Sequence, residues 1–315
     1  MSAKIELSVI VPVSESRYDG TQELYLEYKQ ALETTGLNYE LIYVLDGPYP
    51  DVELALTKLI ESGEEKLRII KLAKYFGEAT ALKAGFKHSS GELIMTLPAY
   101  QQIQSDELPR LIALCDAKVD MVVARRWPRL DSVFNRLQSK VFNQILEGLT
   151  GADFKDLGCS VRVLKRRVVD EIHLYGDQHR FLPALAYRHG FKIVEEDVQQ
   201  SQKDAFQRVY SVGVYVRRLL DLLSVFFLIK FTKKPLRFFG LVGVSIATFG
   251  GLILLYIIGD RLFAGVPLGN RPALMLSSLF VVLGAQIVSI GLIGEMIIFT
   301  HAKKIKEYTV EEIIN

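Results

Sequence analysis

Two long stretches near the carboxyl terminus carry no charged residue, and they constrain the fold of this chain more than any other feature. They run from Phe238 to Ile258 and from Ala273 to Gly294. Each reaches the roughly 20 apolar residues that an α-helix needs to cross a hydrocarbon core of about 30 Å. The segment between them is short and contains Gly and Pro, so the pair predicts a hairpin of transmembrane helices at about 237–259 and 273–299. Two buried helices of a soluble core are the alternative interpretation.

Lysine and arginine residues gather outside the two ends of this hairpin rather than in its loop. The flanking cations are Lys230, Lys233, Lys234, Arg237, Lys303, Lys304 and Lys306, against Arg261 and Arg271 in the loop. By the positive-inside rule we expect a multi-pass protein of the plasma (inner) membrane with both termini, including the tail 302–315, in the cytosol. Residues 210–235 mix paired arginines with Leu, Val and Phe, which predicts amphipathic helices in the headgroup plane. A helix packed on the soluble domain is the alternative for this segment.

The first 209 residues have the alternating pattern of a cytosolic α/β domain. Short apolar or β-branched runs predict strands at 7–13, 40–45, 67–72, 92–97 and 120–124. Helix-like segments separate most of them, at 20–34, 51–62, 77–88 and 105–117. Strands that alternate with helices predict a mainly parallel, doubly wound sheet. In such sheets ligands bind beyond the carboxyl ends of the strands, so Pro12, Val13, Asp46 and residues 98–102 are expected to converge on one crevice.

The charge balance and the cysteines exclude some classes of protein. A net charge of +2 gives no basic footprint for nucleic acid, so no nucleic-acid partner is expected. Cys115 and Cys159 lie far apart without metal-ligand spacing and are expected to be reduced thiols.

Four segments taken together resemble family 2 glycosyltransferases. They read SVIVPV at 8–13, VLDG at 44–47, LAKYFGEATALKAGF at 72–86 and DLGCSVRVLKRR at 156–167. Their order and spacing, with the hairpin, are similar to the polyprenyl-phosphate glycosyltransferase branch, which includes dolichol-phosphate mannose synthases. The resemblance covers roughly residues 5 to 200.

The resemblance implies a GT-A fold and an inverting enzyme. It also implies a nucleotide-sugar donor and a polyprenyl phosphate acceptor at the cytosolic face of the membrane. A membrane-embedded homo-oligomer is compatible with this family.

The resemblance also gives roles to donor-side residues. Asp46 matches the family's nucleotide-binding Asp, with an ordinary Asp-Gly turn as the alternative. Lys74 and Gly77 occupy the strand-to-helix junction, where a cation and exposed amide groups would suit a diphosphate, with a solvated Lys before a helix as the alternative. Pro12 and Val13 end the first strand and are expected to contribute to the same donor site.

On the acceptor side, Asp156 and Arg162 match the acidic and basic residues of the family's acceptor motif and are the expected catalytic pair. A lipid phosphate is already an anion and needs no general base, so Asp156 is expected to position the acceptor or a sugar hydroxyl. A helix N-cap or turn Asp is the alternative for this residue. Arg125, Arg136 and Arg180 are expected to bind the acceptor phosphate through paired guanidinium contacts.

The fourth strand ends differently from the family pattern. Members of the family have a D-x-D motif there, and its carboxylates bind Mg²⁺ or Mn²⁺ next to the donor diphosphate. This chain has Pro98, Ala99 and Tyr100, followed by Gln102. Ala99, Tyr100 and Gln102 are still expected at the donor site, but no residue is predicted to bind a metal, because a hard cation prefers charged oxygen ligands. A catalytically impaired membrane protein that retains the donor-binding fold is the alternative function.

Overall fold

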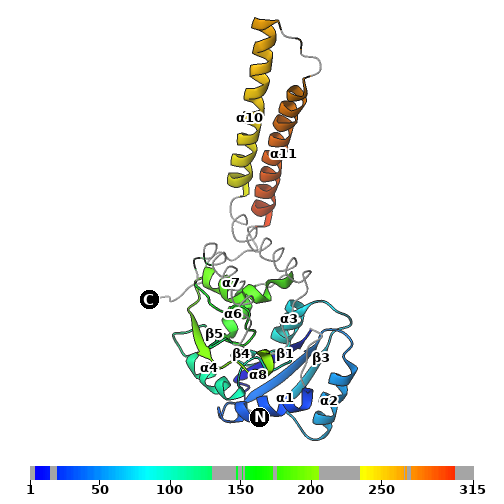
Figure 1. Cartoon of the computed structure of the whole chain (residues 1–315). Helices are drawn as coiled ribbons and strands as arrows, with labels where there is room; N and C mark the ends of the chain where they lie inside the picture. The colour runs from blue at the N-terminus through cyan, green and yellow to red at the C-terminus, as the bar shows by residue number, and fades with distance from the viewer. Residues whose placement is uncertain are drawn as a thin grey trace. The chain divides into compact units, whose positions relative to one another are not determined.

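The computed structural model describes most of the chain. The described residues are 4–14, 20–129, 147, 151, 153–172, 176–205, 235–265, 267 and 271–301. The chain divides into two compact units, Met1–Asp221 with Glu307–Asn315 and Leu222–Lys306, which we describe separately (Figure 1). Arg136, residues 210–234 of the predicted interfacial segment 210–235, and the tail 302–315 lie outside the described residues.

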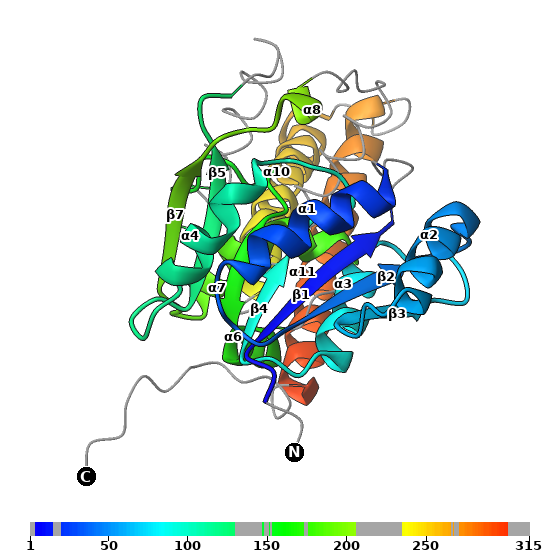
Figure 2. The same cartoon turned by 90° about the horizontal axis from the view of Figure 1, so that it is seen from below.

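A seven-stranded sheet forms the centre of the first unit, in the order β3-β2-β1-β4-β6-β5-β7 (Figure 2). The strands are β1 (Leu7–Val13), β2 (Tyr39–Leu45), β3 (Leu67–Lys71), β4 (Leu93–Thr96), β5 (Met121–Arg126), β6 (Arg162–Lys165) and β7 (Ile193–Val198). Every residue of β1 and β2 is buried, as expected for strands covered on both faces. The predicted sheet is confirmed, and the five predicted strands agree with β1 to β5 to within two residues at each end.

Helices cover both faces of the sheet and create two separate cores. One face carries α1 (Thr21–Glu33), α2 (Pro50–Glu61) and α4 (Leu108–Leu114), whose apolar residues pack on alternate residues of β1. The other carries α3 (Glu78–His88), α6 (Arg166–Glu171) and α7 (Leu182–Arg188). Short pieces complete the unit, namely η1 (Ser105–Glu107), η2 (Gly176–Phe181) and α8 (Gln202–Ala205).

The strand order places the chain segments that follow most strands at one edge of the sheet. All strands except β6 run parallel to one another, so their carboxyl ends share this edge, which we call the carboxyl edge. The order reverses between β1 and β4, which makes their carboxyl ends the topological switch point. β6 is antiparallel, and its first residue, Arg162, therefore pairs with Thr96 of β4 and Val123 of β5 at the carboxyl edge.

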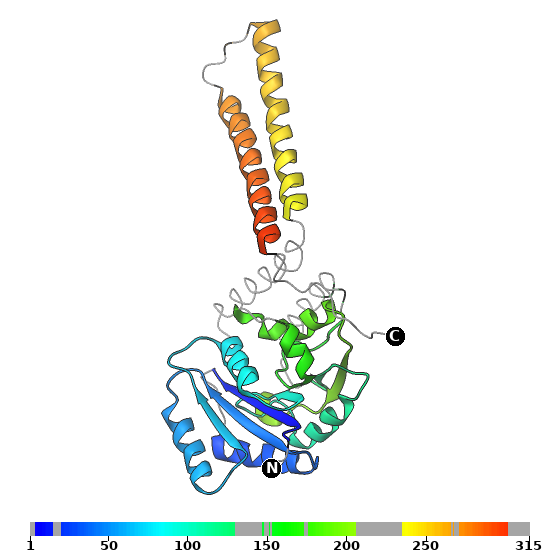
Figure 3. The same ribbon diagram turned by 180° about the vertical axis from the view of Figure 1, so that it is seen from behind.

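The second unit is a pair of antiparallel helices, α10 (Pro235–Ala264) and α11 (Pro272–His301), shown side by side in Figure 3. Pro235–Ala264 and Pro272–Ile297 are long and apolar enough to cross a membrane, and 17% of an apolar 18-residue window in each is buried. A core helix of a soluble protein would be mostly covered, so this exposure favours the membrane interpretation.

The two helices touch through their backbones. A Cβ atom on Gly284 would lie 2.5 Å from the Gly243 carbonyl oxygen, and one on Gly243 would lie 2.6 Å from the Gly284 oxygen. Small residues permit this approach between membrane helices.

Candidate functional site

Asp46 and the start of α3 come together at the carboxyl edge, as expected, but they bind each other. The Asp46 side chain is buried, and its Oδ1 and Oδ2 accept hydrogen bonds from the backbone amides of Phe76 (2.7 Å) and Gly77 (2.8 Å). Both amides lie at the strand-to-helix junction, where the sequence predicts binding of the donor diphosphate. Asp46 therefore fixes the segment between β3 and α3 by binding the two amides that immediately precede the helix.

The end of β1 contacts Asp46 through its backbone. Pro12 and Val13 are buried, and the Val13 carbonyl accepts a hydrogen bond of 3.0 Å from the Asp46 amide. Lys74 is exposed, and its ammonium nitrogen lies 5.3 Å from the centroid of the Phe76 ring. The predicted donor-side residues thus meet at the ends of neighbouring strands.

The segment after β4 is pinned by polar contacts on two sides. Tyr28 donates its hydroxyl to the carbonyl oxygens of Pro98 (3.1 Å) and Tyr100 (3.3 Å). Gln102 donates from Nε2 to the Tyr100 hydroxyl (2.6 Å), and its Oε1 accepts from the amide of Ser160 (2.8 Å). Ala99 between them is buried. Gln102 therefore links the end of β4 to the loop that precedes β6.

This donor set does not fit a divalent cation. No carboxylate follows β4 directly, and the Gln102 amide is engaged at both of its ends. Of the acidic residues one turn later, Glu107 pairs with Arg110 (3.1 Å). The described part of the chain contains no group of three or more His, Cys, Asp or Glu side chains that could hold a metal ion.

Asp156 belongs to a fully buried ion-pair network centred on Arg126. The Arg126 Nε and Nη2 atoms donate to the two carboxylate oxygens of Asp156 at 2.7 and 2.8 Å. Its Nη1 donates to Asp204 of α8 at 2.9 Å, and Gln200 donates to the same Asp204 oxygen at 2.7 Å. Arg126 and Asp204 are 0% exposed and Asp156 is 2% exposed. The network joins the end of β5, the loop before β6 and the segment after β7.

The charges in this network are mutually stabilised. Burial alone would raise the pKa of Asp156, but attraction to the Arg126 guanidinium holds that pKa below its ordinary value. Asp156 is therefore a poor proton acceptor. The same loop is held from outside by Glu195, whose Oε1 accepts from the amides of Lys155 (2.8 Å) and Asp156 (2.9 Å). Burial raises the pKa of Glu195.

Arg162 lies in a second buried cluster at the carboxyl edge. Its Nη1 and Nη2 atoms donate to the backbone oxygens of His179 (2.5 Å) and Arg180 (3.3 Å). Burial lowers the pKa of Arg162 to about 10. The His179 Nε2 lies 3.1 Å from an oxygen of Glu78, the first residue of α3. Burial raises the pKa of Glu78, but the hydrogen bond from His179 and the nearby charges of His179, Arg180 and Arg162 together outweigh burial, so the pKa is lowered.

The predicted phosphate-binding arginines are placed differently from one another. Arg125 is half-buried beside Trp127 and pairs with Asp197 of β7 at 3.2 Å. Arg180 follows His179 in η2, and its backbone carbonyl oxygen accepts a hydrogen bond from Arg162 Nη2. Arg136 lies outside the described residues.

Sequence reasoning missed Arg126, Asp204 and the pair formed by His179 and Glu78. Arg125 and Arg126 are adjacent in a strand, so they point to opposite faces, but both faces are covered by helices. A consecutive Arg pair at a strand end was the only signal, and it does not say which arginine is buried. Asp204 and Glu78 lack any motif that links them to their partners.

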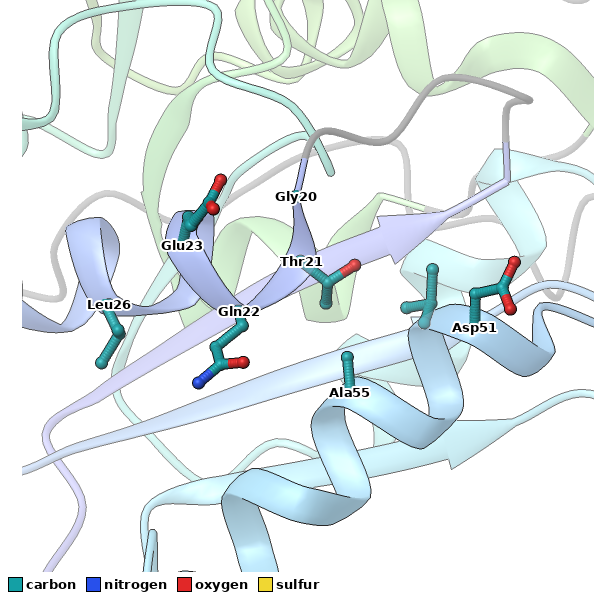
Figure 4. A pocket seen from close by; sticks show the side chains of 8 residues that line it. Gly20, Thr21, Gln22, Glu23, Leu26, Asp51 and Ala55 are labelled. Atoms are coloured by element: carbon teal, nitrogen blue, oxygen red, sulfur yellow. The ribbon is translucent and has the colours of Figure 1, made fainter.

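A hollow of about 580 Å³ lies between α1 and α2 (Figure 4). Gly20, Thr21, Gln22 and Glu23 of the α1 start line it together with Leu26, Asp51, Val52 and Ala55. None of the predicted site residues lines this hollow, so it is separate from the residues described above.

A profile described as glycosyl transferase family 2 matches residues 8–173. The undecaprenyl-phosphate 4-deoxy-4-formamido-L-arabinose transferase of Klebsiella pneumoniae subsp. pneumoniae is 30% identical over 312 residues, covering 98% of this chain and 94% of that protein.

One solved structure shows the same fold at low identity. Mannosyl-3-phosphoglycerate synthase from Rubrobacter xylanophilus is 16% identical with a TM-score of 0.52, covering 70% of this chain and 73% of that one. A mannosyltransferase from Pyrobaculum calidifontis, solved in complex with GDP-Man and Mn²⁺, is 13% identical with a TM-score of 0.46, covering 96% of this chain and 81% of that one.

Proposed function

The chain belongs to glycosyl transferase family 2, and on that premise we propose that it transfers a sugar from a nucleotide-sugar donor to a polyprenyl phosphate of the undecaprenyl or dolichyl type. The reaction takes place at the cytosolic face of the membrane. The glycosyltransferase domain covers residues 1–209, and 236–301 form the membrane anchor.

The observation that carries this proposal is the length of the match to the arabinose transferase. It covers 98% of this chain and 94% of the relative, so it extends beyond the glycosyltransferase domain into the two membrane-length helices. Two such helices would hold the domain at a bilayer, where a lipid acceptor resides. Their retention together with the domain supports an acceptor that resides in the bilayer.

The proposed step forms one bond and breaks one. A phosphate oxygen of the acceptor attacks the anomeric carbon of the sugar, and the bond from that carbon to the donor diphosphate breaks. The nucleoside diphosphate leaves with the electron pair, and the configuration at the anomeric carbon inverts. Because the attacking phosphate is already ionised, no side chain has to remove a proton from it.

The chain's own residues would then bind and position rather than exchange protons. We assign Asp156 to holding the loop before β6 through Arg126, since its low pKa suits a permanent anion. Arg162 would shape the acceptor side of the same loop, with Arg125, Arg136 and Arg180 binding the acceptor phosphate. Asp46, Lys74 and Gly77 would form the donor side with Ala99, Tyr100 and Gln102.

Fixed cations would offset the charge of the donor diphosphate in this chain. The end of β4 offers no carboxylates for a metal, whereas Lys74, in the segment between β3 and α3, is an exposed basic residue. We therefore expect donor binding to persist in the presence of a chelator. A tenfold or greater gain in nucleotide affinity on adding Mg²⁺ or Mn²⁺, about 1.4 kcal/mol, would contradict this expectation.

The test is to incubate the purified full-length chain in detergent with a panel of nucleotide sugars and undecaprenyl phosphate. We expect one donor to be consumed, with release of its nucleoside diphosphate only when the lipid phosphate is present. Undecaprenol without the phosphate is the matched control. If nucleotides bind but no donor is consumed, the alternative of an impaired binding protein gains support, and no binding at all excludes both.

A further inference from the structure

A buried pair of a histidine and a glutamate joins α3 to η2 on one face of the sheet. His179 of η2 is 5% exposed, and its Nε2 atom lies 3.1 Å from the Oε2 atom of Glu78, the first residue of α3. α3 and α7 pack in the same core, and η2 leads directly into α7. The pair therefore connects the helix start assigned to the donor side with the segment that carries Arg180.

The contact with Glu78 is what the histidine contributes at this position. The Nε2 atom of His179 faces Glu78, whereas its Nδ1 atom is buried and has no hydrogen-bond partner among the described residues. A buried polar atom without a partner costs about 1–3 kcal/mol. A residue that carries such a cost is expected where side chains serve function as well as stability.

Glu78 puts a carboxylate at the start of α3. Burial raises the pKa of Glu78, but the hydrogen bond from His179 and the nearby charges of His179, Arg180 and Arg162 outweigh burial, so the carboxyl group stays ionised at neutral pH. The amino end of a helix attracts anions, and α3 begins directly after Gly77. The Glu78 carboxylate and a donor diphosphate would therefore compete for the same electropositive region.

The charges on the donor side do not offset the Glu78 carboxylate. Asp46 adds a second carboxylate, which binds the amide of Gly77, and Lys74 contributes one ammonium group. A nucleoside diphosphate would bring further negative charge to this junction. The cations that attract Glu78 belong instead to η2 and β6, in the form of His179 and two arginines.

We propose that His179 is a positioning residue for the nucleotide-sugar donor, because it holds the Glu78 carboxylate toward η2 and shields the donor diphosphate from its charge. This inference rests on the proposed function, since it needs a diphosphate at the start of α3. Without His179, the Glu78 side chain would turn toward the amides in the first turn of its own helix, and its charge would repel the diphosphate. His179 acts through Glu78 rather than by touching the donor.

Three variants separate this role from a purely structural one. His179→Leu removes the polar contact, His179→Gln keeps an N–H donor for Glu78, and Glu78→Gln removes the carboxylate charge. η2 should keep its place in all three, because Arg162 binds the backbone oxygens of residues 179 and 180 rather than their side chains. His189→Leu is the matched control, because the His189 ring contacts the backbone oxygen of Leu185 (2.8 Å).

The assay is calorimetric titration of the full-length chain in detergent with UDP, GDP, ADP, CDP and dTDP, each beside its uncharged nucleoside. For the diphosphate that binds the wild-type chain, His179→Leu should weaken binding about tenfold, since a nearby like charge shifts ionic equilibria by at least that order. Binding of the nucleoside should stay unchanged. Glu78→Gln should bind the diphosphate at least as tightly as the wild type, and adding it to His179→Leu should restore wild-type affinity. His179→Gln and His189→Leu should both resemble the wild type.

The sign of the Glu78→Gln effect decides between the two roles. Similar losses of diphosphate affinity in Glu78→Gln and His179→Leu would assign the pair to stability alone and overturn the proposal. Equal weakening of nucleoside and diphosphate would overturn it as well, because charge would then play no part. If His179→Leu does not fold, Glu78→Gln carries the test, and a loss of diphosphate affinity there contradicts the proposal.

Failure of the proposed function gives a different result. If none of the five diphosphates binds the wild-type chain, the donor site fails and the positioning role of His179 fails with it. If a diphosphate binds the wild-type chain and neither His179→Leu nor Glu78→Gln changes its affinity, the donor site stands and only the role of His179 is refuted.

Discussion

Replacing Arg126 with Met should cost far more stability than the same change at its neighbour Arg125. Met fills much of the volume but leaves Asp156 and Asp204 buried without their cation. Removing one partner of a buried ion pair costs about 3–5 kcal/mol. Protonation of a carboxylate limits the loss. Protonating a carboxyl group of ordinary pKa at pH 7 costs about 4 kcal/mol, so a buried carboxylate that lost its cation would become neutral rather than lose more than this. We expect Arg126→Met to lose about 3–5 kcal/mol.

Arg125→Met is the matched control. Arg125 pairs with Asp197, a side chain that is 49% exposed, so solvent screens the interaction and its loss should cost about 0–1 kcal/mol. The assay is urea unfolding of the full-length chain in detergent, followed through Trp127, which stands next to both arginines. The slope of the free energy of unfolding against urea should stay unchanged in both variants. Equal losses in the two variants, or a loss below about 1 kcal/mol for Arg126→Met, would refute the reasoning.

The same network predicts how stability depends on pH. The pKa of Asp156 is lowered in the folded chain from its ordinary value of 3.8. An acid with a depressed folded pKa contributes stability that is fully present above its unfolded pKa and is lost as the pH falls through the folded pKa. Wild-type stability should therefore decline steeply below about pH 4, and Asp156→Asn should flatten that decline while lowering stability at neutral pH. An equally steep decline in the variant would contradict the assignment.

The remaining predictions concern other parts of the chain. Asp46→Ala should weaken nucleotide binding by about 1–3 kcal/mol in calorimetry, because the amides it holds become unpaired; unchanged affinity in a folded variant would remove Asp46 from the donor site. Gly284→Leu should destabilise the helix pair by about 1–3 kcal/mol in denaturation by sodium dodecyl sulfate, whereas Gly251→Leu, with no atom within 4 Å of its Cβ position, should be nearly neutral; equal effects would refute the packing. Burial raises the pKa of Cys115 and of Cys159 to about 11 each, so both thiols should react with maleimide only after unfolding, and rapid labelling of the folded chain would show that they are accessible.

Much of the fold could be predicted because local patterns determine it. Short apolar runs separated by helix-like segments predicted β1 to β5, and two charge-free stretches predicted α10 and α11. β6 and β7 were not predicted. β6 has four residues, and its antiparallel direction follows from pairing with β4 and β5 rather than from its own sequence.

The candidate site could be predicted less completely, because partners far apart in sequence decide what each side chain does. Asp46 was expected at the carboxyl edge, but nothing in its neighbourhood indicated that amides of the segment after β3 would satisfy its carboxylate. Asp156 was identified by motif, whereas its partner Arg126 lies 30 residues earlier and Asp204 lies 78 residues beyond Arg126. Such contacts depend on strand order, which no single segment encodes.

Analysis of the product tests the central claim most directly. The full-length chain in liposomes that contain undecaprenyl phosphate is given the donor that it consumes, and the lipids are extracted for mass spectrometry and for determination of the anomeric configuration. We expect one glycosyl residue joined to the lipid phosphate, opposite in configuration to the donor, with one nucleoside diphosphate released for each glycolipid. Donor hydrolysed to free sugar without any glycolipid, or a lipid product that retains the donor's configuration, would contradict the proposed transfer.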